Sequence, residues 1–157
     1  IDKDLWRLIG IWIAEGDFNG YTIRIHNQNK EIREDIGKIC TKYGFVLSEM
    51  ETCVTINSLL LQKIFKNIFG LLAGAKNKRL PPISFTLDKE TKSNLLKGYF
   101  SGDGSIYSAE RGKFKIEAGT VSEELANDLL YLLLDFMKKH QMLIFYDNWL
   151  LSNILML

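Results

Sequence analysis

Two acidic residues, Glu15 and Asp103, each stand directly before a glycine at the end of an apolar stretch. The first stretch reads LIGIWIAEG over residues 8–16, and the second reads LKGYFSGDG over residues 96–104. Carboxylates are hard oxygen ligands, and two of them with room for water suit Mg²⁺. If both stretches are helices whose ends meet, Glu15 and Asp103 are candidates for one shared divalent-metal site.

Small residues at matching positions give the two stretches a way to meet. Gly10 and Ala14 are four residues apart in the first stretch, as are Gly98 and Gly102 in the second. Positions i and i+4 lie on one face of a helix, and a face of small residues lets another helix approach closely. Because mid-helix glycine costs about 1 kcal/mol relative to alanine, its use in both stretches predicts a helix interface.

The position of the two acids is unfavourable unless something binds there. A carboxylate at a helix C-terminus opposes the helix macrodipole by about 0.3 to 1 kcal/mol, and two neighbouring carboxylates also repel each other. The ordinary alternative is a pair of buried helices, each with a glycine cap and a solvated acid. The same order of small residues, acid and glycine in both stretches favours the metal-site interpretation.

Hydrophobic periodicity predicts the elements that position these residues. Residues 5–15 are apolar almost all round, which predicts a buried helix. Residues 20–27 alternate, which predicts a strand with one inner and one outer face. The expected inner residues are Tyr21, Ile23 and Ile25, and the outer ones are Thr22, Arg24 and His26.

The remaining elements follow the same order of helices and strands in both halves. Asn29 and Gly44 are expected to begin and end an amphipathic helix, followed by two short strands within residues 45–58. A helix ending at Gly70 precedes residues 71–85, which hold both prolines and form the predicted linker. The second half is expected to hold a helix over 94–103, a hairpin over 105–119 turning at Arg111-Gly112, a helix over 122–141, and strands within 143–149 and 150–157.

Composition limits the class of protein. The 157 residues have a net charge of +1 and a hydrophobic content of 46%, which is typical of a soluble globular protein. The charged first residues make a signal peptide unexpected, and no apolar run reaches the roughly 18 to 20 residues that span a bilayer. Cys40 and Cys53 lack the spacing of a zinc site and favour a reducing, cytoplasmic setting. A nucleic-acid binder of this charge would have to gather its cations on one face.

Both stretches resemble the LAGLIDADG motif of the DOD-type homing endonucleases of inteins and mobile introns. Between them, Lys78-Arg79-Leu80-Pro81 resembles the intein endonuclease block in which a lysine precedes isoleucine or leucine and then proline. The resemblance covers most of the chain, with a first half over residues 1–88 and a second over 89–157. It implies an α+β fold of two pseudo-symmetric αββαββ(α) halves, with the motif helices paired at the interface and antiparallel sheets forming a DNA-binding saddle.

The resemblance also implies an activity, the hydrolysis of double-stranded DNA at a specific site. In the family the acid of each motif binds the catalytic metals, here Glu15 and Asp103, and the backbone carbonyls of Ala14 and Gly102 can join them. Two or three Mg²⁺ ions would be shared between the two acids. Lys78 matches a family lysine that contacts solvent or phosphate at the cleavage site. The alternative for Lys78 is a solvated loop lysine.

The DNA-binding surface is implied to lie on the hairpins that follow the motif helices. The expected partner is double-stranded DNA with a long target site, bound by a pseudo-two-fold monomer in the cytoplasm, or in the organellar matrix for an intron-encoded protein. Because Ile1 is not an initiator methionine, the chain is expected to be a piece of a larger protein, such as an intein. The expected DNA contacts are Thr22, Arg24 and His26 in the first half and Lys113, Lys115 and Glu117 in the second.

Other functions stay open at this point. One is an inactive LAGLIDADG-type module that binds nucleic acid as a maturase or regulator, or a degenerate intein endonuclease domain. Another is an interaction domain whose glycines serve only helix packing, which predicts neither metal dependence nor affinity for DNA. Both motif acids are present, and this favours the enzyme, because a pure binder has no need of them. Glu15 stands where aspartate is commoner in the family, and the first hairpin is short.

Overall fold

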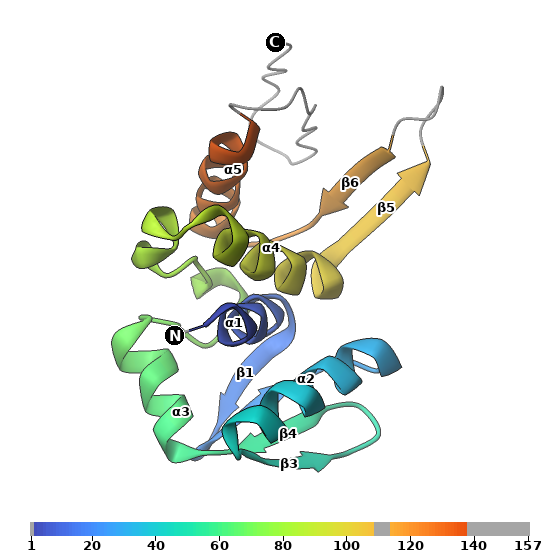
Figure 1. The fold of residues 1–157 in the computed structure, drawn as a ribbon, viewed down its shortest axis with the longest axis vertical. Helices are drawn as coiled ribbons and strands as arrows, with labels where there is room; N and C mark the ends of the chain where they lie inside the picture. Colours follow the sequence, from blue (N-terminus) through green and yellow to red (C-terminus); the bar gives the residue numbers. More distant parts are fainter. Residues whose placement is uncertain (1, 109–113, 138–157) are drawn as a thin grey trace.

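The computed structural model describes residues 2–108 and 114–137 (Figure 1). The first part of the chain holds α1 (Lys3–Glu15), β1 (Gly16–Asn19), β2 (Thr22–Ile25), α2 (Lys30–Tyr43), β3 (Val46–Glu49), β4 (Val54–Asn57) and α3 (Leu59–Lys63). The second part holds α4 (Lys89–Asp103), β5 (Gly104–Ser108), β6 (Phe114–Ala118) and α5 (Glu123–Met137). The order helix, strand, strand, helix therefore occurs in both parts.

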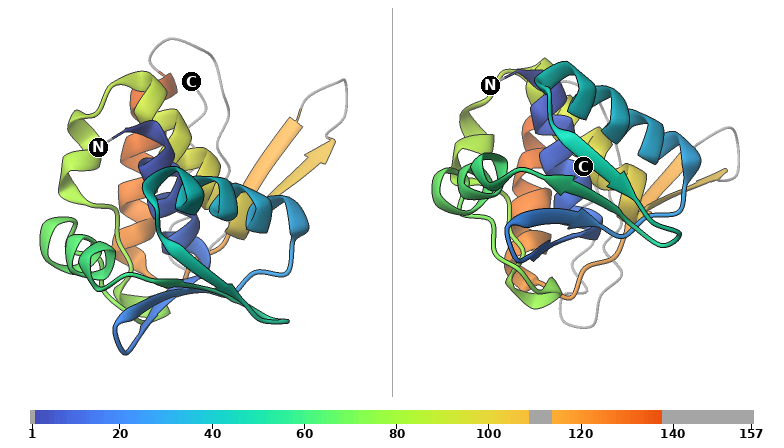
Figure 2. Two further views of the ribbon diagram at one scale, coloured as in Figure 1. Left: turned by 60° about the horizontal axis from the view of Figure 1, so that its bottom comes forward. Right: turned by 90° about the horizontal axis from the view of Figure 1, so that it is seen from below.

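Helices α1 and α4 pack against each other in the middle of the molecule (Figures 1 and 2). The sheet of the first part, α2 and α3 lie on one side of this pair, and α5 with the β5–β6 hairpin lies on the other. Because α1 is enclosed by both parts, its side chains are buried around nearly its whole circumference, as its apolar sequence predicts. The buried residues of α1 are Leu5, Trp6, Leu8, Ile9, Gly10, Ile11, Trp12 and Ile13.

The first sheet is antiparallel with the strand order β1-β2-β4-β3. Ile23 and Ile25 of β2 are fully buried, which confirms the expected inner face of that strand. Tyr21 was expected beside them, and this prediction is wrong, because the residue is 74% exposed. Tyr21 lies in the turn between β1 and β2, before Thr22 begins the strand, so the alternation of the strand does not reach it.

The predicted ends of α2 are confirmed, whereas the predicted start of α4 is wrong. The side chain of Asn29 accepts hydrogen bonds from the first turn of α2, and Gly44 ends that helix at φ 69°. Helix α4 begins at Lys89 rather than at Asn94, because the Asp88 carboxylate caps it by accepting the backbone N–H of Thr91. After α3 the chain continues as a π-helical turn, Ile64–Ile68, before Gly70.

Residues 71–85 were predicted to be a linker, and in the structure they are a packed connection. Leu71, Leu80 and Ser84 are buried, and two short 3₁₀ turns, Ala75–Asn77 and Pro82–Thr86, shape the backbone. Leu71 and Leu80 belong to the hydrophobic core of the protein, which the residues of a free spacer would not do. Packing against the core therefore holds residues 71–85 in a defined position.

The second part of the chain is described only up to residue 137. Strands β5 and β6 pair in an antiparallel hairpin in which Gly104 faces Ala118. The expected turn at Arg111-Gly112 and the strands expected within 143–149 and 150–157 lie outside the described residues. In the part of the chain that the structure describes, no helix combines the length and apolarity that crossing a bilayer requires.

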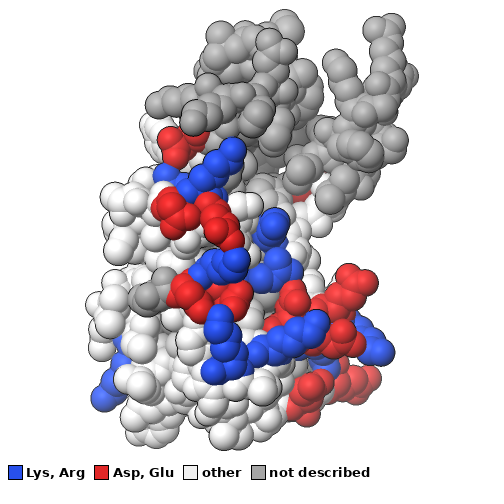
Figure 3. All heavy atoms as spheres, viewed as in Figure 1, with Lys and Arg blue, Asp and Glu red and all other residues white. Residues whose placement is uncertain are grey.

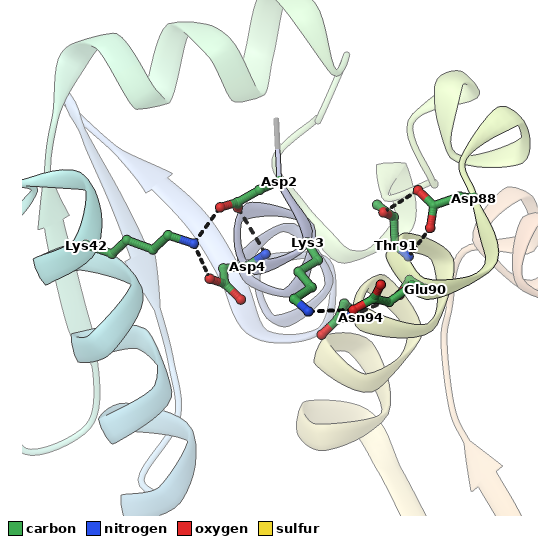
Figure 4. A network of polar contacts seen from close by, with 8 residues as sticks. All are labelled: Asp2, Lys3, Asp4, Lys42, Asp88, Glu90, Thr91 and Asn94. Carbon is green, nitrogen blue, oxygen red and sulfur yellow. Dashed lines mark hydrogen bonds and ion pairs between the residues drawn. The ribbon is translucent and has the colours of Figure 1, made fainter.

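A charged network ties the N-terminal ends of α1 and α4 to their surroundings (Figure 4). Lys42, near the end of α2, donates to the carboxylates of Asp2 and Asp4 at the start of α1. Lys3 of α1 donates to Glu90 of α4. The hydrogen bond from Lys42 holds the pKa of the Asp2 carboxyl well below its usual range. This network lies at the opposite end of the helix pair from Glu15 and Asp103.

Candidate active site

Helices α1 and α4 touch backbone to backbone at two glycines. A Cβ added to Gly10 would lie 2.1 Å from the backbone oxygen of Leu95. A Cβ added to Gly98 would lie 2.2 Å from the backbone oxygen of Arg7. Cβ atoms do not approach oxygen atoms this closely, so only glycine permits this helix crossing at both positions.

Ala14 and Gly102 extend the contact toward the C-terminal ends of the helices. A Cβ on Gly102 would lie 2.6 Å from the Cβ of Ala14 and 2.9 Å from the Cγ of Glu15. The carboxyl carbon of Glu15 lies 3.9 Å from that same position, and Asp103 is the next residue along α4. The crossing therefore brings the ends that carry Glu15 and Asp103 together.

The electrostatics of Asp103 agree with this proximity. Burial raises the pKa of Asp103 to about 6, and the negative charge of Glu15 adds to that increase, while Lys78 opposes it. Two carboxylates are thus held near each other where at least one is partly withdrawn from water. A bound cation would relieve both the repulsion and the cost of burial.

Replacing Asp103 by asparagine should stabilise the fold above about pH 6, because the folded state holds the carboxylate at a cost. The contribution of Asp103 to stability is complete below its ordinary pKa of 3.8 and is lost as the pH rises through about 6. The gain in unfolding free energy of Asp103→Asn over the parent, measured with urea, should therefore grow between about pH 4 and pH 7.

Asp88→Asn is a control with the opposite sign. Hydrogen bonds from Thr91 lower the pKa of Asp88, so its carboxylate stabilises the fold at neutral pH, and this contribution is lost as the pH falls. A pH-independent difference between Asp103→Asn and the parent would contradict the assignment of a raised pKa to Asp103.

Lys78 is buried at the C-terminal end of α1. The residue is 7% exposed, so the alternative of a solvated loop lysine is wrong. The Nζ atom donates to the backbone oxygens of Trp12 at 3.1 Å and Ala14 at 3.2 Å, which places a cation at the negative end of the helix dipole. Burial lowers the pKa of Lys78 to about 8, and the charges of Asp103, Glu15 and Asp17 oppose this shift.

Helix α5 and the residue before it hold the backbone that follows this lysine. The Ser122 hydroxyl donates to the backbone oxygen of Lys78 at 2.6 Å and accepts the N–H of Leu125. The Asp128 carboxylate accepts the N–H of Leu80 at 3.0 Å. Ser122 and Asp128 are both buried, so these bonds are shielded from water. The sequence predicted a helix from residue 122 but contains no sign that Ser122 also anchors Lys78.

Replacing Ser122 by alanine should lower the free energy of unfolding by about 2 to 3 kcal/mol. The change removes a helix cap and leaves the buried carbonyl of Lys78 without this donor, and each loss costs about 1 kcal/mol or more. Urea denaturation measures the difference. Ser58→Ala, which removes only the cap of α3, should cost about half as much. Equal losses in the two variants would show that the Lys78 contact contributes nothing.

A pocket of about 420 Å³ opens beside these residues. Asp103 and Lys78 line it together with Ala14 at the end of α1, while Glu15 is not among the lining residues. The lining also includes the segment between β6 and α5 and the first turn of α5. These residues are Gly119, Thr120, Val121 and Leu125.

Two of the residues expected to bind DNA are paired within the protein. Arg24 donates to the Asp17 carboxylate from Nε at 3.0 Å and from Nη2 at 2.7 Å. His26 Nε2 lies 3.5 Å from the same carboxylate. The Thr22 hydroxyl donates to the backbone oxygen of Asn19 across the turn. All three lie on the outer side of the first sheet or at its edge, as expected.

The pairing of Asp17 with Arg24 was not predicted, although the hairpin turn in the sequence indicates it. The two residues Gly20 and Tyr21 form a hairpin turn, with Gly20 at φ 55°. A two-residue turn fixes the register of a hairpin, and this register places Asp17 opposite Arg24.

The expected DNA contacts of the second half are described only in part. Glu117 lies on β6 opposite Ser105 of β5 and makes contacts of its own. Lys113 lies outside the described residues, and Lys115 is placed on β6 by its backbone alone. The face shown in Figure 3 intersperses Lys and Arg with Asp and Glu. That face is therefore not the segregated basic surface that a DNA-binding protein of this net charge requires.

The donor set at the helix ends fits one class of metal ion. In residues 2–108 and 114–137, no group of three or more His, Cys, Asp or Glu side chains is arranged to hold a metal. A structural zinc ion, which takes four nitrogen or sulfur ligands, therefore does not fit there. Mg²⁺ keeps several waters and is commonly bound through one or two carboxylates and substrate phosphates. Glu15 and Asp103 provide that number of carboxylates.

Comparisons with known sequences place this chain among much longer proteins. It is 33% identical over 149 residues to an uncharacterized protein of Methanocaldococcus jannaschii, covering 85% of this chain and 17% of that protein. It is 30% identical over 142 residues to a DNA polymerase of Thermococcus kodakarensis, covering 85% of this chain and 8% of the polymerase. The chain thus spans less than a fifth of the length of either relative.

Two further comparisons concern the fold and the domain. The solved N-terminal LAGLIDADG domain of DUF199/WhiA matches 92% of this chain and 70% of that chain, with a TM-score of 0.57 and 14% sequence identity. At this identity the likeness is one of fold. A family model described as "LAGLIDADG-like domain" matches residues 90–140. The protein therefore has the mixed α/β fold of a LAGLIDADG domain, and it carries a LAGLIDADG-like domain over residues 90–140.

Proposed function

We propose that this chain is a site-specific endonuclease domain that cuts both strands of DNA with the help of Mg²⁺. The observation that carries the proposal is the convergence of Glu15 and Asp103 at the ends of two helices that only glycine allows to cross. A fold that needed only a stable helix pair would gain nothing from two repelling carboxylates at that place.

In this proposal the chemistry is metal-assisted hydrolysis of a phosphodiester bond. Glu15 and Asp103 would hold two or three divalent ions, with the carbonyl oxygens of Ala14 and Gly102 as further ligands. Such ions, when bound, activate water and neutralise charge on the attacked phosphate. The ammonium of Lys78, in the pocket beside Asp103, would stabilise negative charge that develops on a phosphate there. With a pKa of about 8, most of this lysine is protonated at neutral pH.

The proposed DNA-binding saddle consists of the outer face of the first sheet and the β5–β6 hairpin. In a pseudo-symmetric monomer, residues 1–88 and 89–157 would each serve one DNA strand. Whatever affinity for DNA exists should come mostly from release of counterions, so it should fall steeply with salt. The expected contacts remain Thr22, Arg24, His26, Lys113, Lys115 and Glu117.

The relatives support a further part of the proposal, that the chain is a segment of a larger precursor. They include DNA polymerases many times longer than this chain. An endonuclease domain within an intein would have this relation to its host protein. The proposed setting is the cytoplasm.

One observation favours a second candidate, a LAGLIDADG-type module that binds nucleic acid without cutting it. The carbonyl oxygen of Ala14, a ligand in the proposed metal site, already accepts a hydrogen bond from Lys78. A carbonyl oxygen has two lone pairs and can serve both partners, but this bond makes it a weaker ligand.

Plasmid cleavage against a library of inserted sites, in Mg²⁺ and in Ca²⁺, distinguishes these functions. Linear plasmid that accumulates in Mg²⁺ from particular library members supports the endonuclease. Selective retention of DNA without cutting in Mg²⁺ supports the binding module. If the protein neither retains DNA nor cuts it, the interaction domain is the only one of these functions that remains.

A further inference from the structure

We infer that Asp17 sets the selectivity of DNA binding, because it occupies Arg24 and His26 in the free protein and reduces their attraction for phosphate. The inference rests on the proposed function, in which the outer face of the first sheet meets DNA. Asp17 is thus a specificity-determining residue that acts through its neighbours.

Asp17 contacts both Arg24 and His26. The β1–β2 register places Asp17 directly opposite Arg24, and the two Arg24 hydrogen bonds end on different carboxylate oxygens, Oδ1 and Oδ2. The backbone N–H of His26 donates to the backbone oxygen of Glu15, which fixes this residue beside the helix end. About a third of each side chain of the Asp17–Arg24 pair is exposed, so DNA can reach the pair.

The exchange of partners is unfavourable for an isolated phosphate. A guanidinium presents the same two-pronged face to a carboxylate and to a phosphate, so a phosphate must displace Asp17 to reach Arg24. The displaced carboxylate then lies beside the phosphate and repels it. DNA of arbitrary sequence therefore gains little from Arg24.

A base pair can satisfy both members of the pair at once. In the major groove, guanine presents two acceptors to an arginine, and cytosine presents an amino donor to a carboxylate. Arg24 and Asp17 together are complementary to the edge of one G·C pair. The Asp17–Arg24 pair thus favours binding to the major-groove edge of a G·C pair over binding to the phosphate backbone.

Asp17→Asn removes the charge and keeps the shape of the side chain. Binding to a duplex of arbitrary sequence, measured by fluorescence anisotropy at low salt, should become about 3- to 10-fold tighter. The slope of log affinity against log salt should steepen by about 0.9, the value for one added phosphate contact. Asp35→Asn is the matched control: Asp35 pairs with Arg7 on α1 at a similar exposure, and its loss should leave the slope unchanged.

A double variant shows whether Asp17 acts through Arg24. In an Arg24→Gln background, Asp17→Asn should tighten binding much less than in the parent. Arg24→Lys keeps the positive charge but loses the two-pronged contact with Asp17. It should therefore tighten binding to arbitrary duplex, as Asp17→Asn should. This second variant tests the inference if Asp17→Asn does not fold.

The outcomes separate this inference from the proposed function. Tighter, more salt-dependent binding by Asp17→Asn and not by Asp35→Asn supports the inference. If the parent binds DNA and Asp17→Asn binds arbitrary duplex no more tightly, the inference is overturned and the endonuclease proposal stands. If neither the parent nor any variant binds DNA, both are overturned.

Discussion

Glu15→Gln and Asp103→Asn should each lower the rate of plasmid cleavage by more than about 100-fold. Loss of an outer-shell partner of a metal site commonly costs 10- to 100-fold, and loss of a proposed ligand should cost more. Glutamine and asparagine keep the size of the side chains but remove the negative charge that holds a divalent ion. The measurement is the initial rate of linear product formation in Mg²⁺ on a plasmid selected from the site library.

The matched control lies on the same helix as Asp103. Glu90→Gln changes an acid at the opposite end of α4, where Glu90 pairs with Lys3, and should leave the rate nearly unchanged. Because Asp103→Asn is also expected to stabilise the fold at neutral pH, lost cleavage in that variant cannot be attributed to unfolding. Cutting that survives both acidic substitutions would exclude Glu15 and Asp103 as metal ligands.

Gly10→Ala and Gly98→Ala should each lower the free energy of unfolding by about 3 kcal/mol. Overpacking a core commonly costs 1 to 3 kcal/mol, and the cost here should be at the upper end because the obstructing atoms are backbone atoms. They lie at 2.1 Å and 2.2 Å from the added Cβ, so the two helices must separate to accept a methyl group. Urea denaturation followed by circular dichroism measures the loss.

Gly37→Ala is the control for helix propensity. Gly37 lies in the middle of α2, and the nearest atom to an added Cβ is a Leu47 methyl group at 4.0 Å. Alanine is favoured over glycine in a helix by about 1 kcal/mol, so this variant should be more stable than the parent. If Gly10→Ala showed the same gain, the two helices would not be in backbone contact.

The sequence was most informative where the chain has a local reason for its residues. Glycine at positions 10 and 98 is costly in a helix, and the structure shows the close approach that explains both residues. Capping residues marked the ends of α2 in the same way. Both kinds of signal depend on the backbone conformation or close approach that one residue type permits, so one sequence is enough to read them.

The contacts that sequence reasoning missed join residues far apart in the chain. Ser122 and Asp128 hold the backbone around Lys78 from a helix more than forty positions away, and no local pattern encodes that partnership. The prolines and lysines of residues 71–85 are typical of a linker. The burial of Leu80 was not predicted, because it depends on packing against a core formed by distant residues. Asp17 was missed for a different reason, since the hairpin register that pairs it with Arg24 could have been read from the turn.

The position of a bound divalent ion tests the central claim most directly. In crystals soaked with Mn²⁺, which scatters anomalously, we expect an ion within about 2.5 Å of carboxylate oxygens of both Glu15 and Asp103. The same soak of Glu15→Gln and Asp103→Asn crystals should leave that position empty. Mn²⁺ found only elsewhere on the protein, or retained at the helix ends in both variants, would contradict the account.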